Sequence, residues 1–249
     1  MKKMDKTKKR YKQNNIEIIN EDCLDFLKKI ESDTIDLILT DPPYEISRTT
    51  GFKSVVNGVQ RFAVSMDFGE WDYDFKGLDE VITEFHRILK KGGTLIIFYD
   101  IWKISYLVKL LENVKFKQLR FIEWLKTNPV PLNSKVNYLT NAREIAITAV
   151  KQGNPTFNSK YDNGIYSHPI YHGKNRCHPT QKPLLLFEEL IKKHSNEEDL
   201  VVDCFLGSGT TALASKNTNR NFAGCEIDSG FYKKSIKIVG ADTNEKTKK

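Results

Sequence analysis

Cysteines, long apolar runs and signal-type segments are scarce or missing in this sequence of 249 residues. Its four cysteines, Cys23, Cys177, Cys204 and Cys225, show no C-x-x-C spacing, which argues against a zinc ribbon or a dithiol redox motif. The longest apolar stretches, such as residues 95–99, are far shorter than the roughly 20 residues that a bilayer span needs. The charged N-terminus precedes no apolar segment of the secretory type. We therefore expect a cytoplasmic protein with free thiols, neither secreted nor membrane-spanning.

Net charge is also small where the chain is expected to fold. The formal charge is +7, but residues 1–12 hold seven basic residues and one acidic residue, and residues 241–249 hold three and two. We expect a basic flexible arm over residues 1–13 and a flexible tail over 241–249. Between them, residues 13–100 hold 9 basic and 17 acidic residues, whereas residues 101–178 hold 12 and 4. The basic middle segment, more than the total charge, indicates a polyanionic partner.

Short apolar runs alternate with helical patterns along residues 14–240, which we expect to form one domain. Residues 35–40 and 94–99 are nearly continuous apolar runs, as in strands buried on both faces. Residues 78–90 show helical spacing, and the following glycine pair is expected to end that helix. The alternation predicts an α/β fold with a mixed, mostly parallel sheet. The other expected strands are 16–20, 118–126, 144–150, 200–205 and 222–227, the second and third antiparallel, and the other expected helices are 24–30, 101–113, 183–194, 210–216 and 231–239.

A glycine turn near the C-terminus predicts a nucleotide-type cofactor pocket. The segment DCFLGSGTTA at 203–212 follows an expected strand and opens an expected helix. Gly207 and Gly209 stand where the chain must turn and where a missing Cβ lets the backbone approach a ligand. Glu226 ends the next strand, where an acidic residue can accept hydrogen bonds from ribose hydroxyls. NAD and S-adenosylmethionine both fit this pattern; Asp203 favours the second, because a carboxylate there can receive a cationic amino group.

The tetrapeptide Asp41-Pro42-Pro43-Tyr44 directly follows the apolar run at 35–40. A proline pair after a strand can be an ordinary turn, yet open α/β sheets place active sites at the carboxyl ends of strands. Proline has no amide donor, so this corner offers carbonyl oxygens and the Asp41 carboxylate as acceptors. Tyr44 can stack on a flat ring. The corner therefore suits an NH2 group on an aromatic base.

These two motifs together resemble the DNA amino-methyltransferases, which carry D-P-P-Y and F-x-G-x-G motifs. The order, with D-P-P-Y first, is similar to the beta group of that family, in which the fold is circularly permuted. HPTQKP at 178–183, WLKTNP at 124–129 and NED at 20–22 look like further family signatures. The resemblance covers about residues 15–240 and implies a Rossmann-like S-adenosylmethionine-dependent methyltransferase fold. It also implies site-specific methylation of N6 of a flipped-out adenine in DNA, with N4 of cytosine as the alternative because D-P-P-Y is more often associated with adenine.

The resemblance further implies roles for individual residues. Tyr44 would stack on the flipped base, while Asp41 and the Pro42 carbonyl would accept hydrogen bonds from its amino group; the catalytic set is Asp41, Pro42, Pro43 and Tyr44. Lys182 would pair with the cofactor carboxylate, with Asp203 near the methionyl part. Glu226 would hold the ribose and Asp22 the cofactor adenine. The full expected cofactor set is Asp22, Cys23, Asp41, Thr180, Gln181, Lys182, Asp203, Phe205, Gly207, Ser208, Gly209, Thr210, Glu226 and Ile227.

Two long irregular stretches, about 46–76 and 128–178, are expected to be insertions that recognise DNA. For the irregular part at about 151–178, a solvated polar loop is the simpler alternative. The resemblance makes DNA the partner, leaves open a homodimer and a cognate restriction endonuclease that acts separately, and implies a bacterial or phage-encoded protein. The expected DNA contacts are Arg48, Lys53, Arg61, Lys126, Asn128, Lys135, Lys160, Lys174 and Arg176.

Two other functions and one metal site compete with this interpretation. An NAD-dependent oxidoreductase would use the glycine turn but leaves residues 41–44 and the basic middle segment unexplained. A DNA-binding module without catalysis is disfavoured by the intact Asp41 and Tyr44. A zinc site would have to use His168, His172, Cys177 and His178, whose spacing matches no standard knuckle, so we expect no metal.

Overall fold

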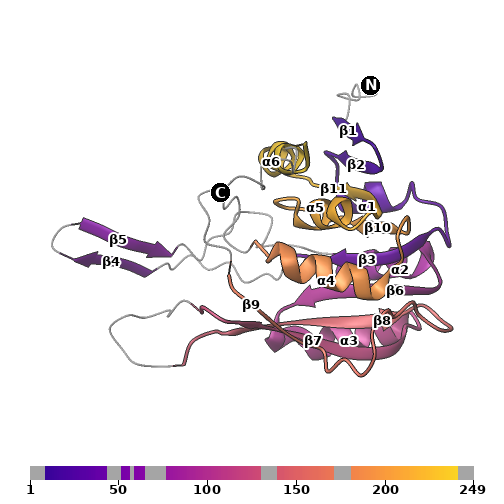
Figure 1. The fold of residues 1–249 in the computed structure, drawn as a ribbon, viewed down its shortest axis with the longest axis horizontal. Coiled ribbons are helices and arrows are strands. Elements are labelled where there is room, and N and C mark those ends of the chain that lie inside the picture. Colours follow the sequence, from indigo (N-terminus) through magenta and orange to yellow (C-terminus); the bar gives the residue numbers. More distant parts are fainter. Residues whose placement is uncertain are drawn as a thin grey trace.

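The computed structural model describes residues 9–43, 52–56, 59–64, 77–129, 139–170 and 181–240, with 52–56 and 59–64 described as backbone only. Its main sheet has nine strands in the order β1-β2-β11-β10-β3-β6-β8-β7-β9 (Figure 1). These strands are β1 (Arg10–Gln13), β2 (Ile16–Ile19), β3 (Ile35–Thr40), β6 (Leu89–Tyr99), β7 (Lys117–Lys126), β8 (Arg143–Val150), β9 (Ile165–His168), β10 (Leu200–Asp203) and β11 (Asn221–Cys225). A separate hairpin joins β4 (Phe52–Val56) to β5 (Val59–Val64).

Five neighbouring strands of the main sheet, β2, β11, β10, β3 and β6, run parallel, so their carboxyl ends lie at one edge. Strand β8 is antiparallel to both β6 and β7, which confirms the antiparallel pair predicted around residues 118–126 and 144–150. The expected mixed, mostly parallel α/β sheet is therefore confirmed.

Helices cover both faces of this sheet, which explains the continuous apolar strands. The first face packs against α1 (Cys23–Leu27), α2 (Leu78–Ile88) and α3 (Ile104–Asn113), which follows the short helix η2 (Ile101–Lys103). The second face packs against α4 (Leu184–His194), α5 (Thr210–Asn217) and α6 (Ser229–Gly240). Along β3, Ile38 points to the first layer, whereas Leu37 and Leu39 point to the second. No helix in the described ranges is long and apolar enough to cross a membrane.

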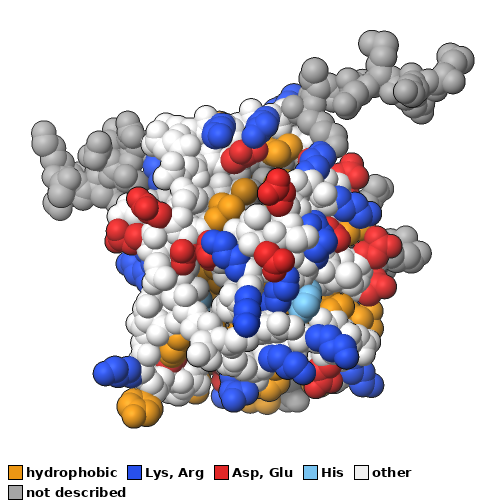
Figure 2. Space-filling view, turned by 90° about the vertical axis from the view of Figure 1, so that its right-hand side faces the viewer, with side chains coloured by type: hydrophobic (Ala, Val, Ile, Leu, Met, Phe, Trp, Pro, Cys, Tyr) orange, Lys and Arg blue, Asp and Glu red, His pale blue; other side chains and the backbone are white. Residues whose placement is uncertain are grey.

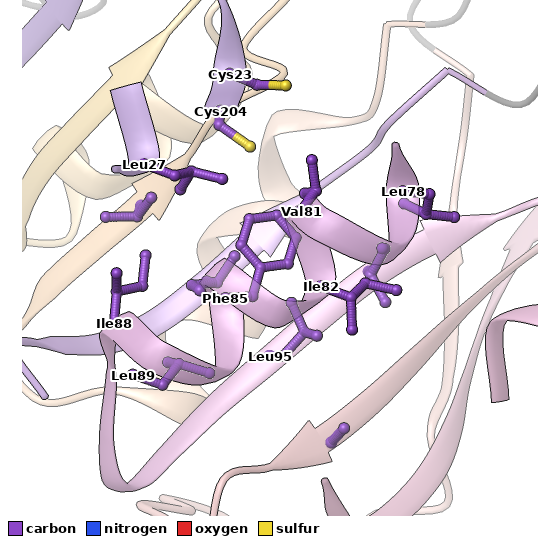
Figure 3. Packing of buried hydrophobic residues seen from close by; sticks show 14 of the residues in the cluster. Cys23, Leu27, Leu78, Val81, Ile82, Phe85, Ile88, Leu89, Leu95 and Cys204 are labelled. Carbon is purple, nitrogen blue, oxygen red and sulfur yellow. The ribbon is translucent and has the colours of Figure 1, made fainter. Parts of the chain in front are cut away.

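The first layer is organised around α2. Phe85 is fully buried and lies among aliphatic side chains from α1, α2 and β6, including Leu27, Val81 and Leu95 (Figure 3). Burying one such side chain contributes about 2 kcal/mol. Helix α2 ends at Ile88, two residues before the predicted boundary, and the glycine pair that was expected to stop it lies inside β6. Strand pairing decides this boundary, because Leu89 pairs with Ile35 and is fully buried.

Several short strands were not predicted. Strand β1 lies within the segment expected to form a flexible arm, yet it pairs with β2 from Arg10 opposite Ile19 to Gln13 opposite Ile16. Only Tyr11 of its four residues packs against the core, so periodicity gave no signal, and the stabilising partner is the open edge of β2. The hairpin of β4 and β5 and the edge strand β9 lie in the two stretches expected to be irregular.

The face at the amino ends of the parallel strands, on the right in Figure 1, carries basic and acidic side chains in close alternation (Figure 2). Two ion pairs lie near this edge: Lys90 with Asp36 at 2.6 Å, and Lys151 with Asp33 at 2.7 Å. Mixed charges attract a polyanion weakly. Among the described residues, this edge therefore offers no uniformly basic surface to a polyanion.

One buried histidine should make stability depend on pH. Burial lowers the pKa of His194, at the end of α4 beside Phe157, to about 4, compared with 6.5 for the ordinary side chain. Between these values the unfolded chain binds more protons, so stability falls as pH drops from about 6.5 toward 4. Wild type should lose about 2 kcal/mol more than His194→Gln between pH 7 and pH 5, measured by urea unfolding. Equal losses would contradict the assignment.

Candidate active site

Four acidic residues lie at the carboxyl ends of adjacent parallel strands. Asp22 and Glu226 follow β2 and β11, Asp203 ends β10, and Asp41 follows β3. These strands are neighbours in that order, so the sheet assembles residues from both ends of the chain in one row. For Asp41, Asp203 and Glu226 this position at the strand ends is the one inferred from the sequence, whereas Asp22 was named there only through the family resemblance.

The turn between β10 and α5 uses its two glycines differently. Gly207 and Gly209 have φ of +53° and +90°, where a side chain is strained. A Cβ on Gly209 would lie 2.8 Å from Cβ of Ser235, so α6 packs directly against this residue. A Cβ on Gly207 would meet no protein atom within 4 Å. Packing therefore requires glycine at 209, whereas Gly207 faces open space that suits the close approach of a ligand.

Asp203 stabilises the turn through three hydrogen bonds. It is buried, and its Oδ1 accepts hydrogen bonds from Oγ1 of Thr40 at 2.6 Å and from the Phe205 amide at 3.0 Å. Its Oδ2 accepts a hydrogen bond from Oγ1 of Thr211 at 2.6 Å. Burial raises the pKa of Asp203 to about 6. Asp203 thus ties the end of β3 to the start of α5, and its expected place near the methionyl part stays a prediction.

Glu226 fixes the other side of the turn. Its Oε2 accepts a hydrogen bond from the Gly207 amide at 2.8 Å, and its Oε1 accepts one from the Asp228 amide at 2.8 Å. Burial raises the pKa of Glu226. Each carboxylate oxygen has a second lone pair, so the side chain keeps acceptor capacity for hydroxyl groups. The turn and the acidic residue 19 positions later are therefore one hydrogen-bonded unit.

The neighbouring strand ends extend this row of residues at the carboxyl edge of the sheet. Asn20 donates through Nδ2 to the carbonyls of Glu226 and Ile227, at 2.7 and 3.0 Å, while the Ile227 side chain is 62% exposed. Asp22 caps α1, because its Oδ1 accepts a hydrogen bond from the Leu24 amide at 2.9 Å. The backbone is thus fixed where an apolar side chain and a carboxylate face solvent. Within the turn, Phe205 is half-buried, Ser208 and Thr210 are buried, and the two hydroxyl oxygens lie 3.3 Å apart.

Three of the four cysteines lie close to these strand ends. Cys23, Cys204 and Cys225 are free and buried. Burial raises the pKa of Cys23 to about 12 and also raises the pKa values of Cys204 and Cys225. These thiols are therefore protonated and poorly reactive. Cys177 lies outside the described residues.

The acceptor corner lies beside a buried lysine. Asp41 and Pro43 are half-buried and Pro42 is buried, directly after β3. The Lys182 ammonium donates a hydrogen bond to Oδ2 of Asp41 and lies 3.1 Å from Oε2 of Glu144 at the start of β8. The Lys182 side chain is 4% exposed. The sequence interpretation gave Lys182 a different partner, the cofactor carboxylate, and did not single out Glu144.

These residues lie within the part of the chain that matches a known protein family. The DNA methylase family model matches residues 35–237, which include the acceptor corner, the glycine turn and Glu226. The chain belongs to this DNA methylase family. Its relatives include the Type II methyltransferases M2.DpnII of Streptococcus pneumoniae and M2.MboI of Moraxella bovis. M2.DpnII is 31% identical, over 95% of this chain and 94% of its own; M2.MboI is 32% identical, over 89% and 86%.

Solved structures confirm the methyltransferase fold of this DNA methylase. The structure of the M1.HpyAVI-SAM complex is 30% identical in sequence, with a TM-score of 0.68 over 89% of this chain and 98% of that chain. The cytosine-N4-specific PvuII DNA methyltransferase has a TM-score of 0.71 over 94% of this chain and 89% of its own, but at 18% identity it supports the fold alone.

Three of the expected DNA contacts of the DNA methylase have described side chains, and the three lie in different surroundings. Lys126 is at the carboxyl edge, but its side chain is 11% exposed, pairs with Glu144 at 2.8 Å and lies over the Trp124 ring. Asn128 links two segments, because its Oδ1 accepts a hydrogen bond from the Ile170 amide at 2.6 Å. Lys160 is exposed, in a segment that Asn158 ties to the C-terminal end of α4, away from Asp41. The rest have no described side chains.

Of the remaining predicted residues, Lys53, Arg61 and Gln181 lie within the described ranges. The β4–β5 hairpin carries Lys53 and Arg61 at the carboxyl-edge side of the molecule (Figure 1), with backbone only. Gln181 lies just before Lys182 and α4. Among the described residues there is no group of three or more His, Cys, Asp or Glu side chains that could hold a metal. The predicted residues outside the described ranges are Tyr44, Arg48, Lys135, His172, Lys174, Arg176, His178 and Thr180.

Proposed function

We propose that this DNA methylase transfers the methyl group of S-adenosylmethionine to N6 of a flipped-out adenine at a specific DNA sequence. One observation carries the proposal: the acceptor corner at Asp41 and the glycine turn follow β3 and β10, which are hydrogen-bonded neighbours in the sheet. The first fits an amino group and the second a nucleotide-type cofactor. The Type II methyltransferase relatives and the related SAM complex support the same assignment.

The residues at the glycine turn fit S-adenosylmethionine. The open space beside Gly207 is a cradle that a Cβ would fill, and it adjoins the Glu226 carboxylate. The exposed Ile227 side chain is an apolar surface suited to the flat adenine of the cofactor. When bound, the cofactor supplies its methyl group from a sulfonium centre.

Asp41 and the Pro42 carbonyl would act on the amino group of the target base. That group is paired and shielded in a duplex, so the base must leave the stack to reach this corner. Hydrogen bonds to Asp41 and Pro42 draw the nitrogen lone pair out of ring conjugation and hold it in line for attack. The positive charge that develops on nitrogen is stabilised by the Asp41 carboxylate. The alkylated nitrogen then loses one proton to water. Tyr44 is the expected stacking partner of the base.

The proposal is tested by expression in a host that does not methylate its DNA. Sequencing with modification detection should find N6-methyladenine at one short sequence. If N4-methylcytosine were found instead, the target base would be cytosine and not adenine. Unmodified DNA, together with a melting temperature that rises with NAD and not with S-adenosylmethionine, would refute the function.

The named relatives also support a setting. Because they are Type II methyltransferases of bacteria, we propose that this chain acts on bacterial DNA in the cytoplasm, alongside a restriction endonuclease that binds the same sequence separately. A second copy of the chain is a further proposed partner, and light scattering of the purified protein measures it.

A further inference from the structure

Lys182 bridges two carboxylates at the acceptor corner. Its ammonium hydrogen-bonds Oδ2 of Asp41, lies 3.1 Å from Oε2 of Glu144, and sits 5.2 Å from the centre of the Phe98 ring. Of the three partners, Asp41 directly follows β3, Glu144 is in β8 and Phe98 is in β6. Pro183 follows Lys182 and restricts the Lys182 backbone to extended conformations. The bridge is therefore built by four separate segments.

The bridge continues into a chain of alternating charges. Oε1 of Glu144 lies 2.8 Å from Nζ of Lys126, so the order is Asp41, Lys182, Glu144, Lys126. Burial by itself raises the pKa of Glu144, but the ammonium groups of Lys182 and Lys126 bring it below its usual value. Burial by itself lowers the pKa of Lys182, but the two carboxylates raise it above its usual value. Glu144 and Lys182 are therefore charged at neutral pH, and each of them has two oppositely charged partners.

This arrangement suits what the amino group of the substrate requires of Asp41. The carboxylate must be ionised, and its position must be fixed to within a fraction of an ångström for an in-line attack. Lys182 supplies the fixed contact through Oδ2, and a carboxylate has further lone pairs for the amino group. Glu144 shares the positive charge of Lys182, so that Asp41 is held without being fully neutralised.

We propose that Lys182 and Glu144 are a positioning pair for Asp41, acting on the methyl-transfer step and not on cofactor affinity. The inference rests on the proposed function. It differs from the role expected from the sequence, in which Lys182 binds the cofactor carboxylate. The two roles predict changes in different quantities. Loss of a cofactor ligand raises the dissociation constant of S-adenosylmethionine, whereas loss of a positioning residue lowers the rate constant of transfer at saturating cofactor.

The test is single-turnover methyl transfer to DNA at saturating S-adenosylmethionine, with cofactor binding measured separately by calorimetry. The rate constant should fall about 100-fold in Lys182→Met and about tenfold in Glu144→Gln. The cofactor dissociation constant should stay within about threefold of wild type in both. In Lys182→Met with Glu144→Gln, the rate constant should match that of Lys182→Met alone, because Glu144 acts through Lys182. Lys182→Arg, which keeps the charge, should recover part of the rate.

Lys193 offers a matched control. It also bridges two carboxylates, Asp162 at 2.6 Å and Glu189 at 2.7 Å, and lies over an aromatic ring, that of Tyr166. It is on α4, in the last turn of the helix that begins just after Lys182, and its partners are none of the active-site residues described above. Lys193→Met should lower the melting temperature and leave the rate constant unchanged.

In the single-turnover assay, misfolded enzyme lowers the amplitude of methyl transfer without changing its rate constant. The two quantities therefore distinguish a loss of folded protein from a loss of positioning. If Lys182→Met does not fold, Glu144→Gln, which is nearly isosteric, carries the test. The proposal is overturned if the rate constants stay at the wild-type value, or if the cofactor dissociation constant rises while the rate at saturation does not change. Wild-type protein that transfers no methyl group to DNA would instead refute the proposed function itself.

Discussion

Replacing Asp41 by alanine should lower methyl transfer about 1,000-fold while S-adenosylmethionine still binds with an affinity within about threefold of wild type. Asp41 follows β3 at the acceptor corner, whereas the glycine turn and Glu226 follow β10 and β11. The substitution therefore removes the acceptor of the amino group and leaves the glycine turn and Glu226 intact. Lys182 keeps its ion pair with Glu144, so the fold should persist. Single-turnover assays and calorimetry measure the two quantities.

Asp36→Asn is the matched control for this change. Asp36 lies at the opposite end of the same strand, where it pairs with Lys90 and accepts a hydrogen bond from the Leu200 amide. This variant should methylate at the wild-type rate. If Asp41→Ala retained activity, or lost cofactor binding in parallel with activity, the assigned role of Asp41 would be wrong.

Gly207→Val should weaken S-adenosylmethionine binding by about 100-fold, or about 2.7 kcal/mol. Two effects combine. A β-branched residue at φ +53° is strained by roughly 1–2 kcal/mol, and its side chain enters the open space where we place the cofactor. Calorimetric titration measures the loss directly. Methyl transfer at subsaturating cofactor should fall by a similar factor.

A second glycine separates strain from obstruction. Gly153 has φ of +75° in the turn after β8, near the amino-end edge of the sheet. Gly153→Val should destabilise the fold through the same backbone strain without affecting cofactor affinity. Wild-type affinity in Gly207→Val, or equal affinity losses in both variants, would refute the cofactor cradle.

Much of the site was predictable because strand ends are local features. Apolar runs locate β3 and β10, and residues that follow such runs must lie at the carboxyl edge of a parallel sheet. The apolar pattern is therefore sufficient to place Asp41 and Asp203 at that edge. The glycines at 207 and 209 could be recognised as a turn, but only the structure shows that α6 packs on the second and nothing on the first.

The contacts of Lys182 could not be predicted from local pattern. Glu144 is 38 positions away, at the start of a strand that runs antiparallel to β6, and its distance from Lys182 depends on strand order and register. A polar residue opening an apolar strand is the only sequence signal, and it is common. Strand β1 escaped prediction for a related reason, because it pairs with β2 mainly through the backbone and three of its four side chains are polar and exposed.

The most direct measurement is nucleoside analysis by mass spectrometry of DNA incubated with the purified protein and methyl-labelled S-adenosylmethionine. The account predicts that the label appears in N6-methyldeoxyadenosine, and that Asp41→Ala gives only about a thousandth of that rate. Label in N4-methyldeoxycytidine, or no label in DNA, would contradict it.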